Sequence, residues 1–302
     1  MNGNIEQLKQ RKDPSQRQYF AYLLLLPTVV IITAFHVLPI FYSFGLSLFN
    51  WDLISEARYA GLRNFRLLTE DPLFWKSLWN TIYYTVLSVP MSIIFSLTIA
   101  MLLNSRIKGI DAYRVIYFIP VITSINAVSI VWKLIYHPNF GLLNKMLESI
   151  GIPGQRWLLD PKWAMFSIVV MSVWKHLGYN VIIFLTGLKN IPQHLYEAAT
   201  VDGAGKWSQF RHITWPLLSP VTFFILVMSI IGSFQVFAQI YMMTPGGGPM
   251  NSTMTVVFYL YKVGFGDFHF GYAAAVAFEL FIMIFALTLV QKLVVEKRVH
   301  YQ

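Results

Sequence analysis

Residues 197–216 read Glu197-Ala-Ala-Thr-Val-Asp-Gly-Ala-Gly-Lys-Trp-Ser-Gln-Phe-Arg-His-Ile-Thr-Trp-Pro216, a polar loop between two apolar stretches at 164–187 and 216–243. The alanines favour a helix, and either of the two glycines, Gly203 or Gly205, can supply the positive φ that ends it. Pro216 suits the first turn of a following helix, where its missing N–H is not needed. The loop therefore predicts a short helix, a turn, a second short amphipathic piece and then a long apolar helix.

The chain around this loop is mostly apolar. Of its 302 residues, 56% are hydrophobic and 12% are charged, against about 25% charged in ordinary soluble domains. The charges fall in narrow bands, and the runs between them reach or exceed the roughly 18 residues of a transmembrane candidate. The runs without charge are 18–51, 77–105, 115–132 and 212–261. Two further apolar spans hold one charge each, Lys175 in 164–188 and Glu279 in 270–291.

We therefore expect an all-α polytopic membrane protein with six transmembrane helices. Each is long enough, at about 1.5 Å per residue, to cross about 30 Å of hydrocarbon. The helices are expected near 20–45, 77–103, 113–135, 164–187, 216–243 and 271–294. Their prolines, at 27, 39, 90 and 120, act either as packing kinks or as gating hinges, and both interpretations stay open. The turn-rich stretch 244–253 ends the fifth helix, and 254–265 is too short to cross alone.

The basic residues fix the orientation. Thirteen Lys and Arg residues flank the spans on the side of the 197–216 loop and seven on the other, and the richer side faces the cytoplasm. We expect a cytoplasmic segment at 1–19, a transmembrane domain at 20–295 with its cytoplasmic loop at 188–216, and a cytoplasmic tail at 296–302. Because topology accounts for the net charge of +9, no nucleic-acid partner is expected, only the lipid bilayer.

The loop resembles the EAA loop of ABC importer permeases. That pattern is Glu-Ala-Ala, a Gly four positions after the second Ala, and Ile-x-Leu-Pro beginning ten residues later. The matching positions are Glu197, Ala198, Ala199, Gly203, Ile213 and Pro216. One position departs, since Trp215 stands where the pattern has Leu. The resemblance implies that the loop docks in a groove of an ATP-binding subunit, with Asp202 and Arg211 able to form ion pairs there.

The resemblance extends over nearly the whole chain, to the carbohydrate branch that includes the maltose and glycerol-3-phosphate systems. The strings that carry it lie at 38–51, 173–180, 187–192 and 246–253. It implies import of a sugar or oligosaccharide across a bacterial cytoplasmic (inner) membrane. It also implies a second permease of similar fold, two ABC ATPase subunits and an extracytoplasmic solute-binding protein.

No enzymatic or cofactor motif is present in the sequence. The string Gly203-Ala-Gly-Lys206 falls short of a nucleotide-binding loop, which would need Gly at 200 and Ser or Thr at 207, where Thr200 and Trp207 stand. The chain has no cysteine and its seven histidines are scattered. We expect no catalytic residue, metal or cofactor of its own, with ATP and Mg bound by the partner ATPases.

Polar and aromatic residues within the spans are candidates for the transport pathway, because polar groups in a membrane face a cavity or a partner helix. The candidates are Asn126, Tyr179, Asn180, Phe234, Gln235, Phe237, Gln239 and Glu279. Phe234 and Gln235 fall where the resemblance to the maltose-type subunit implies substrate contacts. For the others, hydrogen bonding between helices is an equal alternative. Glu279 either pairs with Lys175 or contacts the solute.

Two other functions remain as alternatives. A permease for glycerol-3-phosphate or a polyol would need converging cations for a phosphate, and Lys175 alone qualifies, which favours a neutral sugar. A stand-alone secondary transporter would use Glu279 as its ion site. The sequence shows no internal repeat of the kind that many such transporters have.

Overall fold

The computed structural model describes residues 14–104 and 110–295, and it is helical apart from one short pair of strands. The predicted segments 1–19 and 296–302 therefore lie mostly or wholly outside the described residues. The longer helices are α1 (Pro14–Ile32), α2 (Leu38–Ser47), α4 (Pro72–Leu103), α5 (Ile110–Ile122), α6 (Ile125–Ile135), α8 (Ala164–Asn190), α12 (Ser219–Phe234) and α15 (Phe270–Val290). The shorter ones are η2 (Thr33–Val37), α3 (Arg63–Glu70), α7 (Leu142–Ser149), α9 (Gln193–Val201), α10 (Lys206–Gln209), η3 (Phe210–Thr214), α11 (Trp215–Leu217), α13 (Ala238–Met243), η4 (Pro245–Gly247), η5 (Pro249–Asn251), α14 (Val256–Tyr261), η6 (Lys262–Gly266) and η7 (Gln291–Val295).

The six predicted spans are present, but two of them are broken. Four helices are long and apolar enough to cross a membrane, at 22–47, 72–103, 164–190 and 270–293, and two bent pairs bring the number to six. This confirms the all-helical polytopic class. The stretch 256–266 forms a shorter apolar helix, as its length predicted.

The third and fifth spans are not the continuous helices that we predicted. The third turns by 108° between α5 and α6, and the fifth turns by 63° just before α12. The fifth also opens at Gln235–Phe237 before α13 resumes. Pro120 lies close to the first break, whereas Pro90 sits inside the unbroken α4. Proline alone therefore does not decide where a span breaks.

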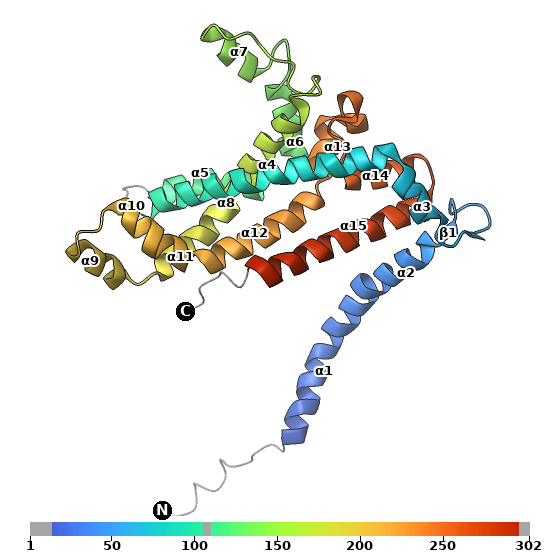
Figure 1. Ribbon diagram of the computed structural model, residues 1–302, viewed down its shortest axis with the longest axis horizontal. Coiled ribbons are helices and arrows are strands. Elements are labelled where there is room, and N and C mark those ends of the chain that lie inside the picture. Colours follow the sequence, from blue (N-terminus) through green and yellow to red (C-terminus); the bar gives the residue numbers. More distant parts are fainter. Residues whose placement is uncertain (1–13, 105–109, 296–302) are drawn as a thin grey trace, which may run out of the picture.

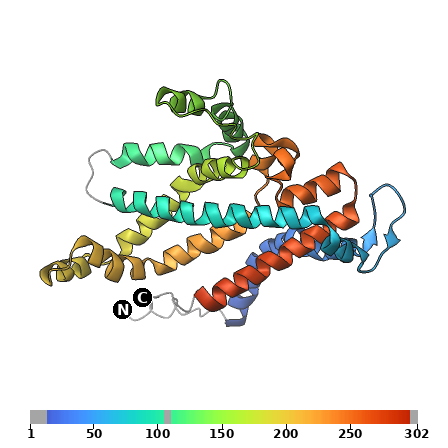
Figure 2. The same cartoon turned by 45° about the horizontal axis from the view of Figure 1, so that its top comes forward.

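The centre of the bundle is the pair α4 and α8, with α12 against both (Figure 2). The face of α4 that meets its neighbours carries small polar residues that let backbones approach closely. The buried members are Ser77, Thr81, Thr85, Ser88, Ser92 and Ser96. Three of them bind across to other helices: Thr81 accepts from the Val256 amide at 3.0 Å, Thr85 bonds to the Ser233 hydroxyl at 2.8 Å, and Ser92 accepts from the Asn180 amide at 2.9 Å.

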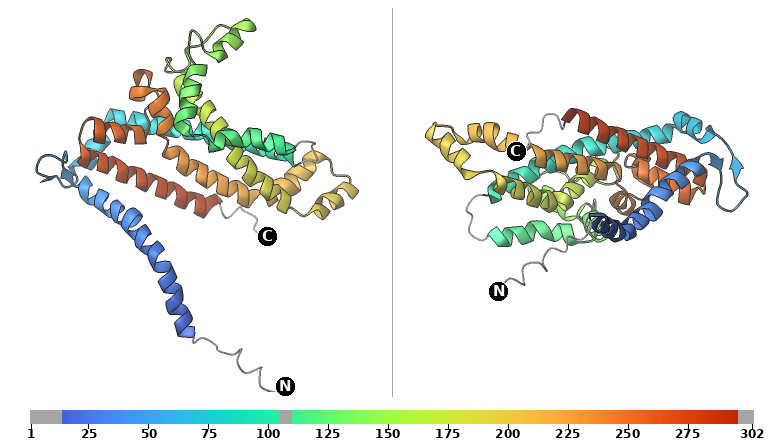
Figure 3. Two further views of the ribbon diagram at one scale, coloured as in Figure 1. Left: turned by 180° about the vertical axis from the view of Figure 1, so that it is seen from behind. Right: turned by 90° about the horizontal axis from the view of Figure 1, so that it is seen from below.

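Helix α1 leaves the bundle. Figures 1 and 3 show it diverging from the other helices, while α2 stays against α15, where the rings of Phe44 and Phe278 lie 4.6 Å apart. Every residue from Tyr22 to Ile32 is exposed within this chain. Since these residues are apolar on all sides, lipid or another protein must cover them.

The end of the bundle where α4 begins is tied together at Asp71, the N-cap of α4. Its side chain accepts bonds from the amides of Leu73 and Phe74 and from the hydroxyl groups of Tyr259 and Tyr272. Partial burial raises the pKa of Asp71, but these four donors outweigh that effect and the net pKa is lowered. The carboxylate thus joins the start of α4 to α14 and α15.

Candidate functional site

The 197–216 loop lies at one end of the bundle, beside the end of α4, with β1 (Phe49–Asn50), β2 (Arg58–Tyr59) and α3 at the other (Figure 1). Its first helix, α9, ends in a Schellman motif. The amide of Ala204 donates to the carbonyl of Ala199 at 2.8 Å, and the amide of Gly203 donates to that of Thr200 at 3.1 Å. Gly203 has φ +78°. The spacing between the second alanine and the glycine is therefore the spacing of this motif.

The rest of the loop is tied to α9 by side chains. The Gln209 amide donates to the Thr200 hydroxyl at 3.0 Å and to the Ala204 carbonyl at 3.3 Å. The hydroxyl groups of Tyr196 and Thr214 lie 2.9 Å apart. These bonds fold α9, α10 and η3 into one unit, which confirms the predicted helix, turn and second short piece. Pro216 lies in α11, at the end of the helical run 206–217, and the long apolar helix that we predicted to begin there begins instead at Ser219.

The outer surface of this unit combines exposed apolar side chains with charges. Val201 is 88% exposed and Trp207 is 73% exposed. The matched positions Glu197, Ala198 and Gly203 are exposed, as are Asp202 and Arg211, while Ala199, Ile213 and Pro216 are half-buried. Glu197 accepts a bond from the Gln193 amide at 2.8 Å. Exposed apolar groups rimmed by polar ones mark protein interaction sites.

A second candidate region lies where the two broken spans meet. Helix α6, the outer half of the third span, packs on α13, the outer half of the fifth. Discontinuous transmembrane helices form the solute sites of many transporters, because their breaks free backbone groups within the membrane. The four pathway candidates Phe234, Gln235, Phe237 and Gln239 all lie at or beside the break of the fifth span.

These four residues face different surroundings. Phe234 is buried in the core, whereas Gln235 is exposed at the break. The buried Gln239 amide points at the hydroxyl groups of Tyr84 and Ser172, 3.4 Å from each. Gln235 is therefore the amide at this break that is open to a ligand.

Phe237, a predicted pathway residue, is one of a series of contacting aromatic rings. The series itself was not predicted from the sequence. Its ring lies 5.4 Å from Tyr241 and 5.1 Å from Tyr261, and Tyr261 stacks on Phe265 at 5.4 Å. Tyr241 and Phe265 are 44% and 60% exposed. The spacing of four residues within each pair, 237 with 241 and 261 with 265, was the signal in the sequence.

The remaining candidates lie apart. Asn126 and Tyr179 are exposed, and Asn180 is buried with its amide on Ser92. Glu279 is half-buried with no hydrogen-bond or ion-pair partner among the described residues. The Lys175–Glu279 ion pair, one of the two predicted alternatives, is not formed, because the Lys175 ammonium group donates to two backbone carbonyls instead.

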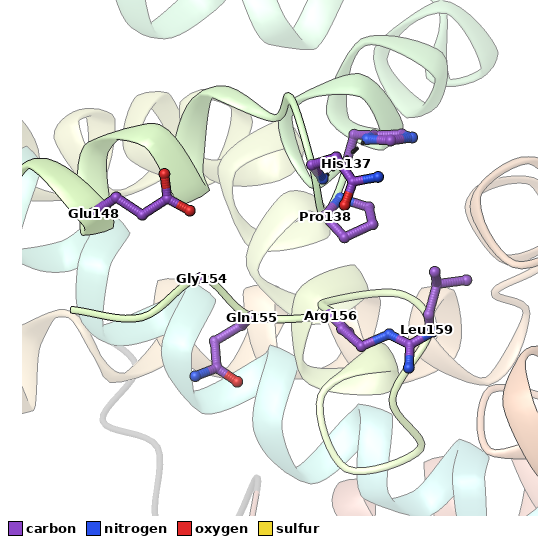
Figure 4. Close-up of a pocket in the computed structure, with 8 residues that line it drawn as sticks. His137, Pro138, Glu148, Gly154, Gln155, Arg156 and Leu159 are labelled. Carbon is purple, nitrogen blue, oxygen red and sulfur yellow. Dashed lines mark hydrogen bonds between the residues drawn. The ribbon is translucent and has the colours of Figure 1, made fainter.

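An arm projects from the side of the bundle between α6 and α8 (Figure 1). Its centre is the buried Asn144, which donates to the carbonyls of Pro138 and Gln155 and accepts from the Gln155 amide and the Trp157 indole. A cleft of about 580 Å³ opens beside it. Figure 4 shows Glu148 of α7 on one side of the cleft and Arg156 on the other. The arm is a folded unit beside the long helices, and its surface combines the charges at the cleft with exposed apolar side chains such as Met146 and Ile150.

Among residues 14–104 and 110–295, no group of three or more Asp, Glu and His side chains is placed to hold a metal ion.

Comparison with known proteins gives a consistent result. A family model described as the binding-protein-dependent transport system inner membrane component matches residues 72–300. The lactose transport system permease LacF of Rhizobium radiobacter is 35% identical over 92% of this chain and 95% of its own. The trehalose/maltose permease MalF of Thermococcus litoralis is 36% identical, over 89% and 91%.

A solved structure shares the fold. The crystal structure of a bacterial ABC transporter that imports the acidic polysaccharide alginate contains a chain that superposes with a TM-score of 0.82, covering 93% of this chain and 96% of that one at 23% identity. The arrangement of helices described above is therefore shared with a chain of a solved ABC transporter.

Proposed function

Because the chain belongs to the family of binding-protein-dependent transport system inner membrane components, the multi-pass permeases of ABC importers, we propose that it carries a neutral carbohydrate across the bacterial inner membrane. The protein is a transport subunit, and ATP is handled by its partner subunits. It works in an ABC transporter complex together with a periplasmic solute-binding protein.

The exposed loop 193–217 is the observation that carries this proposal. It is preorganised by its own hydrogen bonds and presents Val201, Trp207 and Glu197 to the cytoplasm. A groove on an ATPase subunit would cover these groups. The loop follows α8 and leads through α11 into α12. A displacement of the loop by an ATPase subunit is therefore transmitted directly to both helices.

A neutral sugar fits the second region better than a phosphate ester. Aromatic faces such as those of Phe237 and Tyr241 suit sugar rings, and the amide of Gln235 suits hydroxyl groups. Lys175, the one cation predicted for a phosphate, gives two of its three N–H groups to backbone carbonyls. The relatives named for lactose and for trehalose/maltose support the same substrate class.

The proposed complex contains a second permease, two ABC ATPases and the binding protein. The uncovered apolar surface of α1 supports the second permease as a neighbour. The arm at 137–159, where charged residues lie beside exposed apolar ones, supports docking of the binding protein on the outer side. The segment assignment 1–19, 20–295 and 296–302, with its coupling loop at 188–216, is part of the same proposal.

A pull-down tests this assembly. The tagged chain is extracted from its own membrane in mild detergent, and co-purifying proteins are identified by mass spectrometry. We expect a second six-span protein, an ABC ATPase and a binding protein, whose bound sugar is then identified after release. A chain recovered alone would contradict the proposal and favour an ion-coupled transporter that uses Glu279.

A further inference from the structure

The break between α5 and α6 leaves the last carbonyls of α5 without helical partners. In a membrane such groups must be satisfied from within the protein. The hydroxyl of Thr123 donates to the carbonyl of Ile119 at 2.8 Å. The next two carbonyls, those of Pro120 and Val121, point to another helix altogether.

Those two carbonyls are bound by Lys175 of α8. Its ammonium nitrogen lies 2.6 Å from the Pro120 oxygen and 2.9 Å from the Val121 oxygen. The side chain is only 7% exposed, and no described acidic residue pairs with it, since the one ion pair among the described residues joins Arg66 to Glu70. A buried cation is costly without compensation. Here the negative end of the α5 dipole and its free carbonyls provide it.

Gly178, one turn along α8, makes this contact geometrically accessible. A Cβ at this position would lie 2.0 Å from the Tyr117 oxygen and 3.0 Å from Val121 Cγ2. Gly178 and Lys175 are three residues apart and share a helix face. The glycine lets α8 touch α5, and the lysine then reaches the end of α5.

We propose that Lys175 is a positioning residue of the transport pathway, a built-in cation that binds the end of α5 and thereby fixes the direction in which α6 leaves the break. Non-helical transmembrane segments in transporters commonly bind a free cation with such carbonyls. In this chain the cation is covalently attached and does not dissociate.

The consequence reaches the candidate solute site, and here the inference rests on the proposed function. Helix α6 packs on α13, which carries Gln239 and follows Gln235 and Phe237. If α6 loses its direction, the wall formed by α13 shifts as well. Lys175 then acts on transport without touching the solute.

The test uses the assembled transporter with three variants. Lys175→Ala removes the ammonium group and three methylene groups, Lys175→Met keeps an apolar side chain of similar length, and Lys133→Ala removes an exposed lysine of α6 as the matched control. The probe is n-propylammonium, which replaces the part lost in Lys175→Ala. Tetramethylammonium carries the same charge but donates no hydrogen bond.

Two quantities are measured: the apparent Tm of the purified complex, and the ratio of ATPase rates with and without the co-purified binding protein. We expect Lys175→Ala and Lys175→Met to lower both. Propylammonium should raise both for Lys175→Ala only, and tetramethylammonium should raise neither. Lys133→Ala should resemble the parent protein under every condition.

The proposal is overturned if Lys175→Met assembles and keeps the parent's Tm and ATPase ratio, or if propylammonium acts equally on Lys133→Ala. Should Lys175→Ala fail to assemble, an assembled Lys175→Met with a reduced ratio supports the proposal and an unchanged ratio overturns it. The Tm response of Lys175→Ala to the amine is also measured on the chain purified without ATPase subunits, so it holds or fails separately from the importer function.

Discussion

Gly203 and Gly178 are required for different physical reasons. Gly203, in the 197–216 loop, has φ +78° and nothing within 4 Å of the position of a Cβ, so its requirement is purely conformational. Gly178, in α8, lies in a helix, and a Cβ there would overlap the backbone of α5. Its requirement is purely spatial.

The difference extends to the regions around them. The hydrogen bonds that hold the loop join residues at most 18 positions apart. The loop is therefore stabilised by local contacts, and its surface is left available to a partner. The helix break is held by Lys175, 54 and 55 positions from the carbonyls that it binds. In the proposed function the first region contacts another subunit, whereas the contacts of the second lie within this chain.

The largest expected effect comes from reversing a charge on the loop. Glu197→Lys should leave the helix bundle intact and weaken ATPase binding by several kcal/mol, or more than about 100-fold, since like-charge contacts at interfaces cost that much. Co-purification of the ATPase and uptake of the sugar measure it. Glu148→Lys, on the outer arm, is the control for ATPase binding. Normal uptake by Glu197→Lys would remove the loop from the mechanism.

A large side chain at Gly178 should affect the bundle instead. Gly178→Leu forces α5 and α8 apart and should cost about 3 kcal/mol or more, at the upper end of overpacking, seen as a lower Tm of the purified chain. The matched control is Gly232→Ala in α12, where a Cβ meets nothing within 4 Å. Equal Tm values for the two variants would contradict the close contact of α5 and α8.

A side chain at Gly203 should have a smaller and strictly local effect. Gly203→Ala strains the left-handed turn by about 1 kcal/mol, which should lower ATPase affinity about fivefold and leave the Tm of the bundle unchanged. Gly203→Asn should retain affinity, because Asn tolerates this conformation. If Asn proves as harmful as Ala, the backbone angle is not what the position requires.

The smallest effect is expected at the outer end, where Asp71 offers a pH test. Because its pKa is lowered in the folded protein, its stabilisation is full above the unfolded pKa and disappears as the pH falls through the lower folded value. The Tm of the parent should drop below about pH 4 more steeply than that of Asp71→Asn. At neutral pH the variant keeps the N-cap and should lose about 1 kcal/mol, roughly 2–4 °C. Parallel pH curves would exclude this carboxylate as the cause.

The sequence predicted what depends on local spacing. The Glu-Ala-Ala and glycine positions gave the helix and its turn, and charge-free length gave the spans. The breaks at residues 122–125 and 235–237 were missed, because no glycine or proline marks the second and Pro120 resembles the harmless Pro90. At the break between α5 and α6, the carbonyls that end α5 are bound by a lysine of another helix, α8. The sequence identified Lys175 as a charge within a span. Its partners are two backbone carbonyls, and because every residue has a backbone carbonyl, the sequence does not indicate which ones a lysine binds.

Helix α1 gives the chain a different kind of dependence. Eleven consecutive residues, 22–32, find no cover within the subunit, so lipid alone covers them until a neighbour packs there, and in the proposed assembly that neighbour is the second permease. Its stability then follows mass action, and the amount of folded permease in the membrane is set by the supply of its counterpart. Expression of this permease without its partner would yield a shorter-lived protein. The exposed apolar surface of α1 therefore makes balanced synthesis of the two permeases necessary.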